Sequence, residues 1–308
     1  MSRIQFIHEY DDIISIENLL EAWREFIKGK KKRKDVQMFQ LHLMDNIYDL
    51  HIDLKNKTYV HRKYEAFTIS DPKPRNIHKA SVRDRILHRA IYIKLYPFFD
   101  KTFISDSFSC RISKGTHKAI ERFKIFDRKV SMNHTKTAWV LKCDIKKFFA
   151  SIDQSILNNI LVRYIPDKNV LWLLSQIISS FYSTQEGKGL PLGNLTSQLL
   201  VNVYMNEFDQ FVKHKLKVKY YIRYADDFVF LSDNGEYLEN LLPQIEEFLF
   251  DKLKLSLHPD KVSIKTIASG VDYLGWVHFP HHRVLRTSTK RRMFKTIQTK
   301  EGKPETIQ

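Results

Sequence analysis

Two adjacent aspartates interrupt an apolar and aromatic stretch of the sequence, YYIRYADDFVFLS from Tyr220 to Ser232. A turn between two strands would explain their place, but tight hairpin turns prefer Asn-Gly or Asp-Gly because they need positive φ. Two neighbouring carboxylates also raise the cost of ionising each other. A divalent ion such as Mg²⁺, which takes carboxylate and phosphate oxygens, would remove that cost. The pair Asp226 and Asp227 therefore indicates either a structural turn or a metal site.

A third aspartate, Asp144, closes an apolar stretch in LKCDIKKFFASID. An aspartate at the end of a buried strand exposes its carboxylate at the edge of a sheet. The alternative role of helix capping suits Asp153 better, because Asp153 directly precedes an apolar helical pattern. If Asp144 lies beside Asp226 and Asp227, three carboxylates meet. Such a group could hold two divalent cations that clamp the attacking and leaving oxygens of a phosphoryl transfer.

Glycine-rich and cationic segments surround these carboxylates in the sequence. GKGLPLGNLTSQ, residues 187–198, predicts a tight loop that brings backbone close to a ligand at a helix start. SCRISKGTHKAI, residues 109–120, carries Arg111 and Lys114, and such cations suit a triphosphate because they neutralise a leaving pyrophosphate. HPDKV supplies Lys261 as a candidate general acid for that leaving group. Each segment alone is typical of surface charge, and only their order favours catalysis.

The composition indicates a globular protein from a reducing compartment. Hydrophobic residues make up 43% of the 308 residues and aromatic residues 13%, which excludes a disordered chain. No apolar run reaches the ~20 residues that a membrane helix needs, and the N-terminal sequence does not resemble a secretory signal. The two cysteines, Cys110 and Cys143, argue against a disulfide scaffold or a cysteine zinc site and favour the cytoplasm.

The positive charge of the chain favours nucleic acid as a partner. Lysine and arginine number 51 against 35 acidic residues, which gives a net charge of +16. Such a charge attracts polyanions, and no strongly amphipathic basic stretch points to a membrane instead. The densest basic run, KGKKKRK from Lys28 to Lys34, is either a solvated loop or an arm that contacts phosphates without sequence preference.

Hydrophobic periodicity predicts the elements that must position these residues. Their order predicts an α+β fold with helices on one side of a small antiparallel sheet. Helices are expected over residues 12–27, 36–55, 81–99, 153–165, 169–182, 196–216 and 236–255, with a basic helical tail from 286. Strands are expected over 64–80 (broken by Pro72 and Pro74), 139–145, 261–269 and 271–280, with a hairpin around Asp226 and Asp227.

Seven segments resemble, in the same order, the successive blocks of reverse transcriptases. They span about residues 60 to 290 and read PKPRNIHKASVRDRILHRAI, CRISKGTHKAI, LKCDIKKFFASID, GLPLGNLTSQ, YADD, HPDK and DYLGW. The resemblance implies an RNA-directed DNA polymerase, a nucleotidyltransferase that uses two Mg²⁺ ions, or Mn²⁺ in their place. It also implies a right-hand polymerase. Its parts are a basic helical extension (1–60), helical fingers (61–135), a ferredoxin-like antiparallel palm (136–280) and a short, partial helical thumb (281–308).

The resemblance assigns roles to individual residues. Asp144 and Asp226 ligate the metals, Asp227 supports them as the partner carboxylate, and Ile145 joins both the metal site and the nucleotide site. Phe149, five residues after Asp144, blocks a ribose 2′-OH and so selects dNTPs, while Lys261 protonates pyrophosphate. The other implied contacts are Arg111, Lys114, Leu192, Gly193 and Gln198 for the dNTP, Arg75, Arg83 and Arg85 for the template, and Tyr273, Leu274 and Gly275, which resemble the primer-gripping hairpin of the family.

The fourth block departs from the family pattern. Most reverse transcriptases carry Gln-Gly-x-x-x-Ser-Pro there, whereas this chain has leucine at 192 and glutamine at 198. This resembles the enzymes of diversity-generating retroelements, in which an aliphatic residue at this place accompanies error-prone copying of template adenines. An apolar side chain cannot replace the hydrogen bonds of an amide. Neutral drift in a retron-like or group II intron-like enzyme is the alternative.

The C-terminal part is short for this family, since 35 residues follow Tyr273. Either a partner completes the grip on nucleic acid or processivity is low. By resemblance the partners are an RNA template, a DNA or RNA primer, dNTPs and a small basic helical accessory variability protein, in the cytoplasm of a bacterium or archaeon or encoded by a phage. The alternatives are a retron, group II intron or phage-defence enzyme, and a non-catalytic nucleic-acid-binding protein. The intron alternative is weakened because the sequence shows no maturase extension, HNH motif or RNase H cluster.

Overall fold

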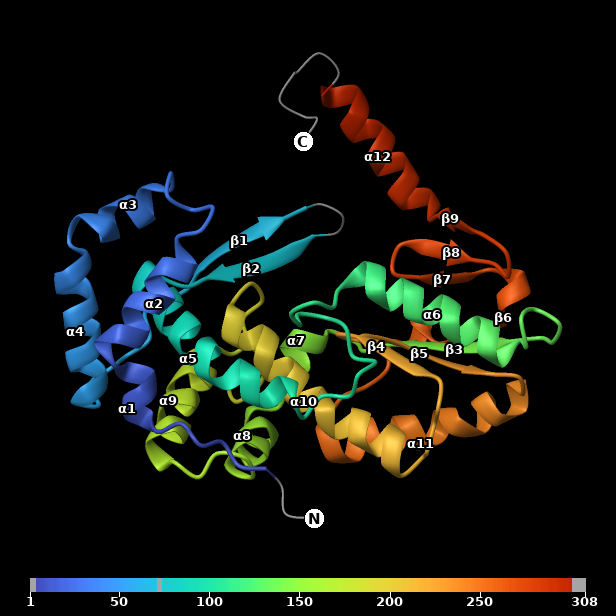
Figure 1. Cartoon of the computed structure of the whole chain (residues 1–308), viewed down its shortest axis with the longest axis horizontal. Helices are drawn as coiled ribbons and strands as arrows, with labels where there is room; N and C mark the ends of the chain where they lie inside the picture. Colours follow the sequence, from blue (N-terminus) through green and yellow to red (C-terminus); the bar gives the residue numbers. More distant parts are fainter. Residues whose placement is uncertain (1–3, 71–73, 301–308) are drawn as a thin grey trace. The chain divides into compact units, whose positions relative to one another are not determined.

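The computed structural model describes residues 4–70 and 74–300, and the chain divides into two compact units (Figure 1). Unit 1 comprises Met1–Ser105, Ile145–Leu216 and Phe248–Ser256, and unit 2 comprises Asp106–Asp144, Lys217–Glu247 and Leu257–Gln308. Among the described residues, no helix has both the length and the apolar character needed to cross a membrane.

Unit 1 is mainly helical, and its helices begin and end close to where periodicity predicts. Two predicted helices are each split. Ser15 separates the first pair because its hydroxyl caps the second helix by accepting the Asn18 N–H, and His42 separates the next pair with a non-helical φ of −120°. The helices are α1 (Tyr10–Ile14), α2 (Ile16–Phe26), α3 (Lys34–Leu41), α4 (Leu43–Lys55), α5 (Val82–Asp100), α7 (Phe148–Ser151), α8 (Gln154–Val162), α9 (Lys168–Ser179) and α10 (Leu195–His214).

A two-stranded hairpin replaces the broken strand that was predicted over residues 64–80. Strands β1 (Glu65–Ile69) and β2 (Arg75–Lys79) pair antiparallel, with Phe67 opposite Ile77. Pro72, one of the two predicted breaks, lies outside the described residues, and Pro74 directly precedes β2. Asp153 caps α8 as predicted, because its carboxylate accepts the backbone N–H groups of Ser155 and Ile156.

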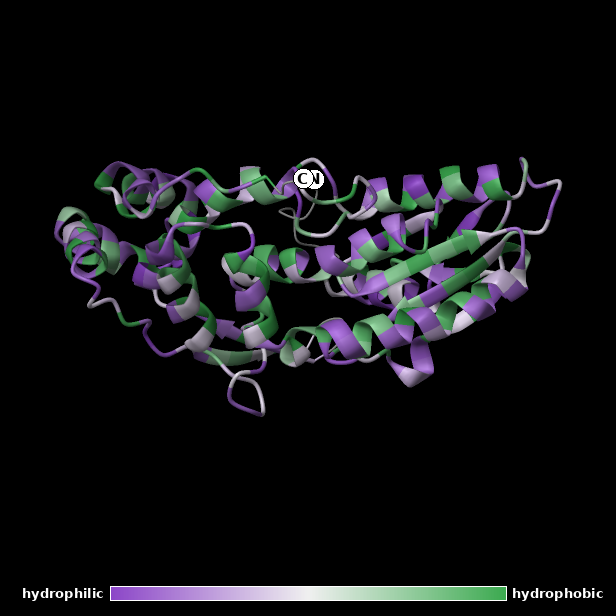
Figure 2. Ribbon diagram, turned by 90° about the horizontal axis from the view of Figure 1, so that it is seen from below, coloured by the Kyte–Doolittle hydropathy of each residue, from purple (hydrophilic) through white to green (hydrophobic). Residues whose placement is uncertain are grey.

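Unit 2 is built on a four-stranded antiparallel sheet with the order β4-β5-β3-β6. Its strands are β3 (Trp139–Asp144), β4 (Tyr221–Tyr224), β5 (Asp227–Ser232) and β6 (Ser263–Thr266). Numbered along the chain, these strands lie in the order 2-3-1-4, which is the arrangement of a ferredoxin-like βαββαβ sheet. The predicted α+β class and ferredoxin-like palm sheet are confirmed, and Figure 2 shows the hydrophobic strands running between helices.

Helices cover both faces of this sheet, so the prediction of helices on one side was wrong. On one face Val140, Ile222 and Val229 pack against α6 (Thr116–Val130), a helix that was not predicted. On the other face the start of α11 (Gly235–Leu253) lies so close to Trp139 that a Cβ at Gly235 would meet its ring at 3.0 Å. The many charged residues of α6 mask the apolar period of its buried stripe, Ala119, Phe123, Phe126 and Val130, in the sequence.

The C-terminal part of unit 2 forms a second, three-stranded sheet. Strands β7 (Val271–Tyr273), β8 (Trp276–His278) and β9 (Arg283–Leu285) follow one another, where one continuous strand had been predicted over 271–280. The tail is helical as expected, in α12 (Thr287–Lys300). Short 3₁₀ turns cover Pro259–Lys261 and Ile267–Ser269. Both cysteines are free, with Cys143 buried and Cys110 exposed.

Candidate active site

The paired aspartates of the sequence meet the third one at one end of the four-stranded sheet. Asp144 is the last residue of β3, and its register partner is Asp227, the first residue of β5. Asp226 lies in the two-residue turn between β4 and β5, next to Ala225, whose φ is +56°. A left-handed alanine is strained, and such strain concentrates at functional turns. The turn at Asp226 is therefore a structural hairpin turn and also part of the carboxylate group. The two interpretations of the paired aspartates, a structural turn and a metal site, are compatible.

Two lysines hold two of the three carboxylates. The Lys261 ammonium donates to Asp144 Oδ1 at 2.6 Å, and the Lys142 ammonium lies 3.7 Å from Asp227 Oδ2. The Lys261 side chain is 40% exposed, whereas that of Lys142 is only 16% exposed. Each cation offsets part of the repulsion between neighbouring carboxylates. The lysines thus supply the positive charge that the sequence analysis assigned to a metal.

Asp227 has the most perturbed environment of the group. The pKa of its carboxyl is raised to about 7, chiefly by burial and also by the charges of Asp144, Asp226 and Asp272, while the charge of Lys142 opposes the rise. Its Oδ1 atom is buried and has no hydrogen-bond partner. Buried polar atoms are nearly always paired, so this atom is an exception that points to a missing ligand. A buried carboxyl with a perturbed pKa among charged neighbours is typical of a functional site.

The donor set fits a hard divalent cation. Carboxylate oxygens are the ligands that Mg²⁺ prefers, and it usually takes one or two of them together with substrate phosphates. Among the described residues, no three His, Cys, Asp or Glu side chains are already arranged to hold an ion. Asp144, Asp226 and the unpaired Oδ1 of Asp227 would hold it, in competition with the lysines that now contact two of these residues.

The cationic loop of unit 2 lies beside the strand that leads to the aspartates. The backbone N–H of Phe108 donates to Arg223 O of β4, and Arg111 Nη1 donates to Ser107 O at 3.0 Å. The Lys114 ammonium lies over the Phe108 ring, 5.1 Å from its centroid. The loop is therefore anchored to the same strand that enters the Asp226 turn. The assignment of Arg111 and Lys114 to a triphosphate stays a prediction.

The remaining predicted nucleotide contacts lie in unit 1. Strand β2 holds the glycine loop, because the His78 N–H donates to Leu192 O and Asn194 Nδ2 donates to His78 O. Gly193 has a φ of +105°, and a Cβ there would meet Ile77 Cγ2 at 2.8 Å, so only glycine fits. Of the other three residues, Phe149 in α7 is half-buried and its backbone carbonyl accepts the Leu190 N–H at 2.8 Å, Ile145 is buried, and Gln198 lies in the first turn of α10.

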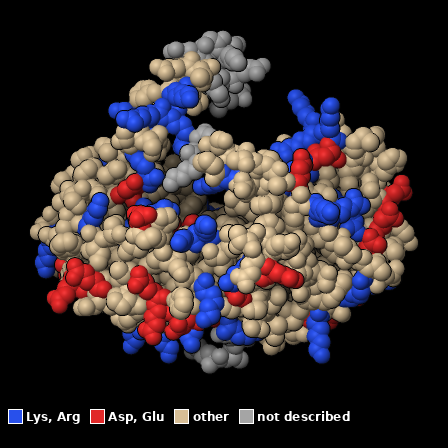
Figure 3. Space-filling view, turned by 180° about the vertical axis from the view of Figure 1, so that it is seen from behind, with Lys and Arg blue, Asp and Glu red and all other residues tan. Residues whose placement is uncertain are grey.

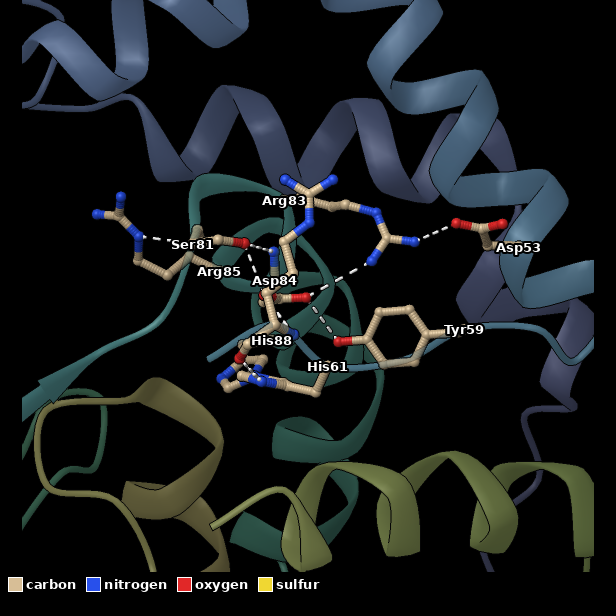
Figure 4. Close-up of polar contacts among 9 residues, drawn as sticks. Asp53, Tyr59, His61, Ser81, Arg83, Asp84, Arg85 and His88 are labelled. Atoms are coloured by element: carbon tan, nitrogen blue, oxygen red, sulfur yellow. Dashed lines mark hydrogen bonds and ion pairs between the residues drawn. The ribbon is translucent and has the colours of Figure 1, made fainter. Parts of the chain in front are cut away.

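Two of the three predicted template-binding arginines are engaged within the protein (Figure 4). Arg83 is 8% exposed and forms ion pairs with Asp53 and Asp84. Arg85 pairs with Asp35 and lies over the Phe26 ring. Arg75 is exposed at the start of β2. A phosphate-contacting role stays a prediction for all three, and Arg75 is the one whose side chain is exposed.

A tight turn carries the predicted primer contacts. Tyr273 pairs with Trp276, and the two residues between them, Leu274 and Gly275, have φ values of +50° and +86°. Positive φ at both central positions defines the primed turn that suits a twisted hairpin. Tyr273 is fully buried, and its hydroxyl has no hydrogen-bond partner. The hairpin is present, and its contact with a primer stays a prediction.

Sequence reasoning missed Lys142. The signal was available, because alternate residues of a strand share a face and Lys142 stands two residues before Asp144. It also missed the buried polar network around Asp84. That network has no chemical motif in the sequence, since its members come from three separate segments.

The chain matches the family described as reverse transcriptase (RNA-dependent DNA polymerase) over residues 63–278. Because this match covers more than half of the 308 residues, the chain belongs to the reverse transcriptase family. The predicted enzyme class, RNA-directed DNA polymerase, is confirmed at the level of the family.

Curated relatives are distant. Protein YkfC of Escherichia coli (strain K12) is 25% identical over 269 residues, which cover 75% of this chain and 68% of YkfC. The group II intron-encoded protein LtrA of Lactococcus lactis subsp. cremoris is 24% identical, with 78% of this chain and 50% of LtrA covered. The putative COX1/OXI3 intron 2 protein of Saccharomyces cerevisiae is 23% identical, with 45% of this chain and 23% of that protein covered. The chain thus spans half or less of the two intron proteins.

A solved structure of apo telomerase from Candida tropicalis, truncated from its C-terminal domain, shares the fold. The TM-score is 0.53 at 12% sequence identity, and the similarity covers 80% of this chain and 60% of that one. At this identity the likeness shows the fold alone, a mixed α+β architecture similar to that of telomerase.

Proposed function

We propose that this protein extends a DNA or RNA primer on an RNA template by adding dNTPs with the help of two divalent metal ions. The observation that carries the proposal is the register of the palm sheet, in which Asp144 lies opposite Asp227 and Asp226 occupies the adjoining turn. When bound, the metal ions stabilise the negative charge on the attacking and leaving oxygens. Asp144 and Asp226 bind them, and Asp227 supports the site.

The other residues act on the substrates. Arg111 and Lys114 hold the triphosphate, and Lys261 gives a proton to the leaving pyrophosphate after its contact with Asp144 is released. Phe149 excludes a ribose 2′-OH. The turn at Leu274 and Gly275 holds the primer end.

The charge of the protein supports a nucleic-acid partner. The net charge is +16, and attraction to phosphates supplies most of non-specific affinity for nucleic acid. On the face shown in Figure 3 the lysine and arginine side chains form several separate groups among acidic ones. The net charge, and not one continuous basic patch on this face, therefore supports the proposal.

Primer extension on a defined RNA template tests the proposal. Wild-type protein with Mg²⁺ and dNTPs should extend the primer, and Asp226→Ala should not. Asp233→Ala, an exposed aspartate beyond the end of β5, is the matched control and should extend normally. If wild type and Asp226→Ala extended equally, the carboxylate group would not be the active site.

We also infer that the enzyme copies template adenines with errors, as diversity-generating retroelement enzymes do. The inference rests on Leu192, whose backbone carbonyl accepts the His78 N–H of β2. Because the backbone is held in this way, the difference from the glutamine of most reverse transcriptases lies in the side chain. Sequenced extension products should show errors mainly opposite adenine, and Leu192→Gln should reduce them. An unchanged error spectrum would contradict this subtype. It would favour the retron, intron or phage-defence alternatives, which the intron-encoded relatives keep open. An accessory protein stays a prediction of the resemblance.

A further inference from the structure

Lys142 occupies a position between two functional parts of unit 2. Its ammonium lies 3.7 Å from Asp227 Oδ2 and donates to the backbone carbonyl of Asp272, in β7, at 2.7 Å. Lys142 shares a face of β3 with Asp144, and its register partner is Val229, two residues from Asp227. The lysine therefore reaches diagonally across the sheet to the carboxylate and also contacts the hairpin strand.

The contact with β7 continues to the C-terminal helix. Arg286 Nε donates to Asp272 Oδ1 at 2.9 Å, and the Arg286 N–H donates to Gly275 O at 3.1 Å. Arg286 directly precedes α12. One arginine thus fixes both the strand and the turn of the β7–β8 hairpin, and Lys142 connects this hairpin to Asp227.

The orientation of the Asp227 carboxylate depends on its contact with Lys142, because of its burial and its charged neighbours. Asp227 carries an unpaired buried oxygen, and the charges of three further carboxylates bear on it. A carboxylate with so few fixed partners needs an oriented cation to stay in one rotamer. Lys142 is the mostly buried cation that contacts it, while the Asp272 carbonyl fixes the direction of the ammonium.

We propose that Lys142 is a positioning residue that fixes the Asp227 carboxylate and the β7–β8 hairpin relative to each other. This inference rests on the proposed function, in which the hairpin holds the primer end and the carboxylates hold the metal ions. Lys142 then sets the distance between the primer terminus and the metal site. Phosphoryl transfer is sensitive to such placement, since small displacements of reacting atoms lose much of the rate.

Single-nucleotide extension at saturating Mg²⁺ separates this role from that of a mere counter-ion. Lys142→Met should lower kcat about 10–100-fold, as losing a residue that orients a metal ligand does, with the dNTP KM within about twofold because Lys142 touches no dNTP contact. Lys142→Arg should recover part of the loss. Lys265→Met, which removes an exposed lysine of β6 in the same sheet, is the control and should be unaffected.

Mn²⁺ binding, followed by electron paramagnetic resonance, gives a readout that does not depend on turnover. Mn²⁺ binding is measured at a pH well above the Asp227 pKa of about 7, where this carboxyl stays ionised without Lys142; there, removing the cation takes away a competitor for the carboxylate and does not weaken its attraction for a metal ion. Lys142→Met should therefore bind Mn²⁺ at least as tightly as wild type while turning over more slowly. A pure counter-ion would give tighter binding with kcat unchanged, which would overturn the proposal.

A second variant, at Arg286, tests the same connection in case the Lys142 variant does not fold. Arg286→Met removes the side-chain link to Asp272 and should lower kcat by less than Lys142→Met. The double variant should lose less kcat than the product of the two single fold-losses, since both substitutions break the same connection. Purely multiplicative effects would contradict the proposal. A wild-type protein that does not extend primers would instead refute the proposed function.

Discussion

Asp84 in unit 1 and Asp227 in unit 2 are both largely shielded from solvent, but their carboxylate oxygens differ in how many partners they have. In unit 1, Asp84 is fully buried, and both of its oxygens are used (Figure 4). Oδ1 accepts the Tyr59 hydroxyl at 2.8 Å and lies 3.7 Å from Arg83, while Oδ2 accepts the Ser81 hydroxyl at 2.6 Å and the Arg62 N–H at 3.3 Å. In unit 2, Asp227 has an ammonium beside one oxygen and no partner for the other.

This difference distinguishes a charged group that stabilises the fold from one that takes part in binding and catalysis. A buried charge whose hydrogen bonds are all made stabilises one arrangement, because moving any partner leaves a polar group unpaired. A carboxylate with an unpaired oxygen keeps the capacity to accept one further ligand. We therefore expect variants around Asp84 to affect folding and variants around Asp227 to affect catalysis.

Asp144→Asn should give the largest effect on activity. Loss of one metal ligand removes several kcal/mol of transition-state stabilisation, so the rate of primer extension should fall on the order of 10³-fold. The free energy of unfolding, measured in urea, should change by only about 1 kcal/mol, because the ion pair that is lost is partly open to water: Lys261 is 40% exposed, although Asp144 is only 15% exposed. A large loss of stability would erase the contrast between the two units.

Asp84→Ala should give the opposite result. Removing one member of a buried ion pair typically costs about 3–5 kcal/mol, because the remaining groups stay unpaired. Tyr59 would lose its carboxylate partner, and Arg83 would lose one of its two. Urea unfolding of the variant measures the cost, and Asp53→Ala, which removes the more exposed partner of Arg83, should cost less. Equal costs would show that the network does not act through burial.

Acid should weaken unit 1 through His88. Burial lowers the pKa of His88 to about 3, with help from the charges of His61 and Arg85. The folded state therefore keeps this imidazole neutral. The contribution of His88 to the free energy of unfolding is fully present above the ordinary histidine pKa of about 6.5 and is lost as the pH falls below it. The loss should reach about 2 kcal/mol at pH 5. The Thr196 hydroxyl lies 3.1 Å from His88 Nδ1, and His88→Gln, which keeps a group to bond it, should flatten the pH dependence. A wild type equally stable at pH 7 and pH 5 would contradict this.

Neutralising the basic run should give the smallest effect. If Lys31, Lys32 and Lys34 contact phosphates, their replacement by glutamine should lower the slope of log affinity against log salt by about 2 for single-stranded RNA. Lys168→Gln, an exposed lysine of the same unit, should leave the slope unchanged. Fluorescence anisotropy at several salt concentrations measures both. An unchanged slope for the triple variant would favour the solvated-loop interpretation.

The sequence was most informative where local pattern decides structure. Asp144, Asp226 and Asp227 could be found because strand periodicity and a turn bring them to one sheet edge, and α8 began at its predicted cap. What could not be found depends on distant contacts. The sequence does not show that Arg83 and Arg85 meet carboxylates 30 and 50 residues away, or that Lys142 meets a strand 130 residues later. The splits at Ser15 and His42 were missed because the apolar period continues across them.

Mn²⁺ binding in the presence of primer and RNA template shows whether the Asp144, Asp226 and Asp227 carboxylates of unit 2 form the metal site. Electron paramagnetic resonance should show Mn²⁺ bound by wild type and by Asp53→Asn, whose carboxylate belongs to the closed network of unit 1. Asp144→Asn should lose at least one bound ion. Equal binding by wild type and Asp144→Asn, or a loss confined to Asp53→Asn, would contradict the account.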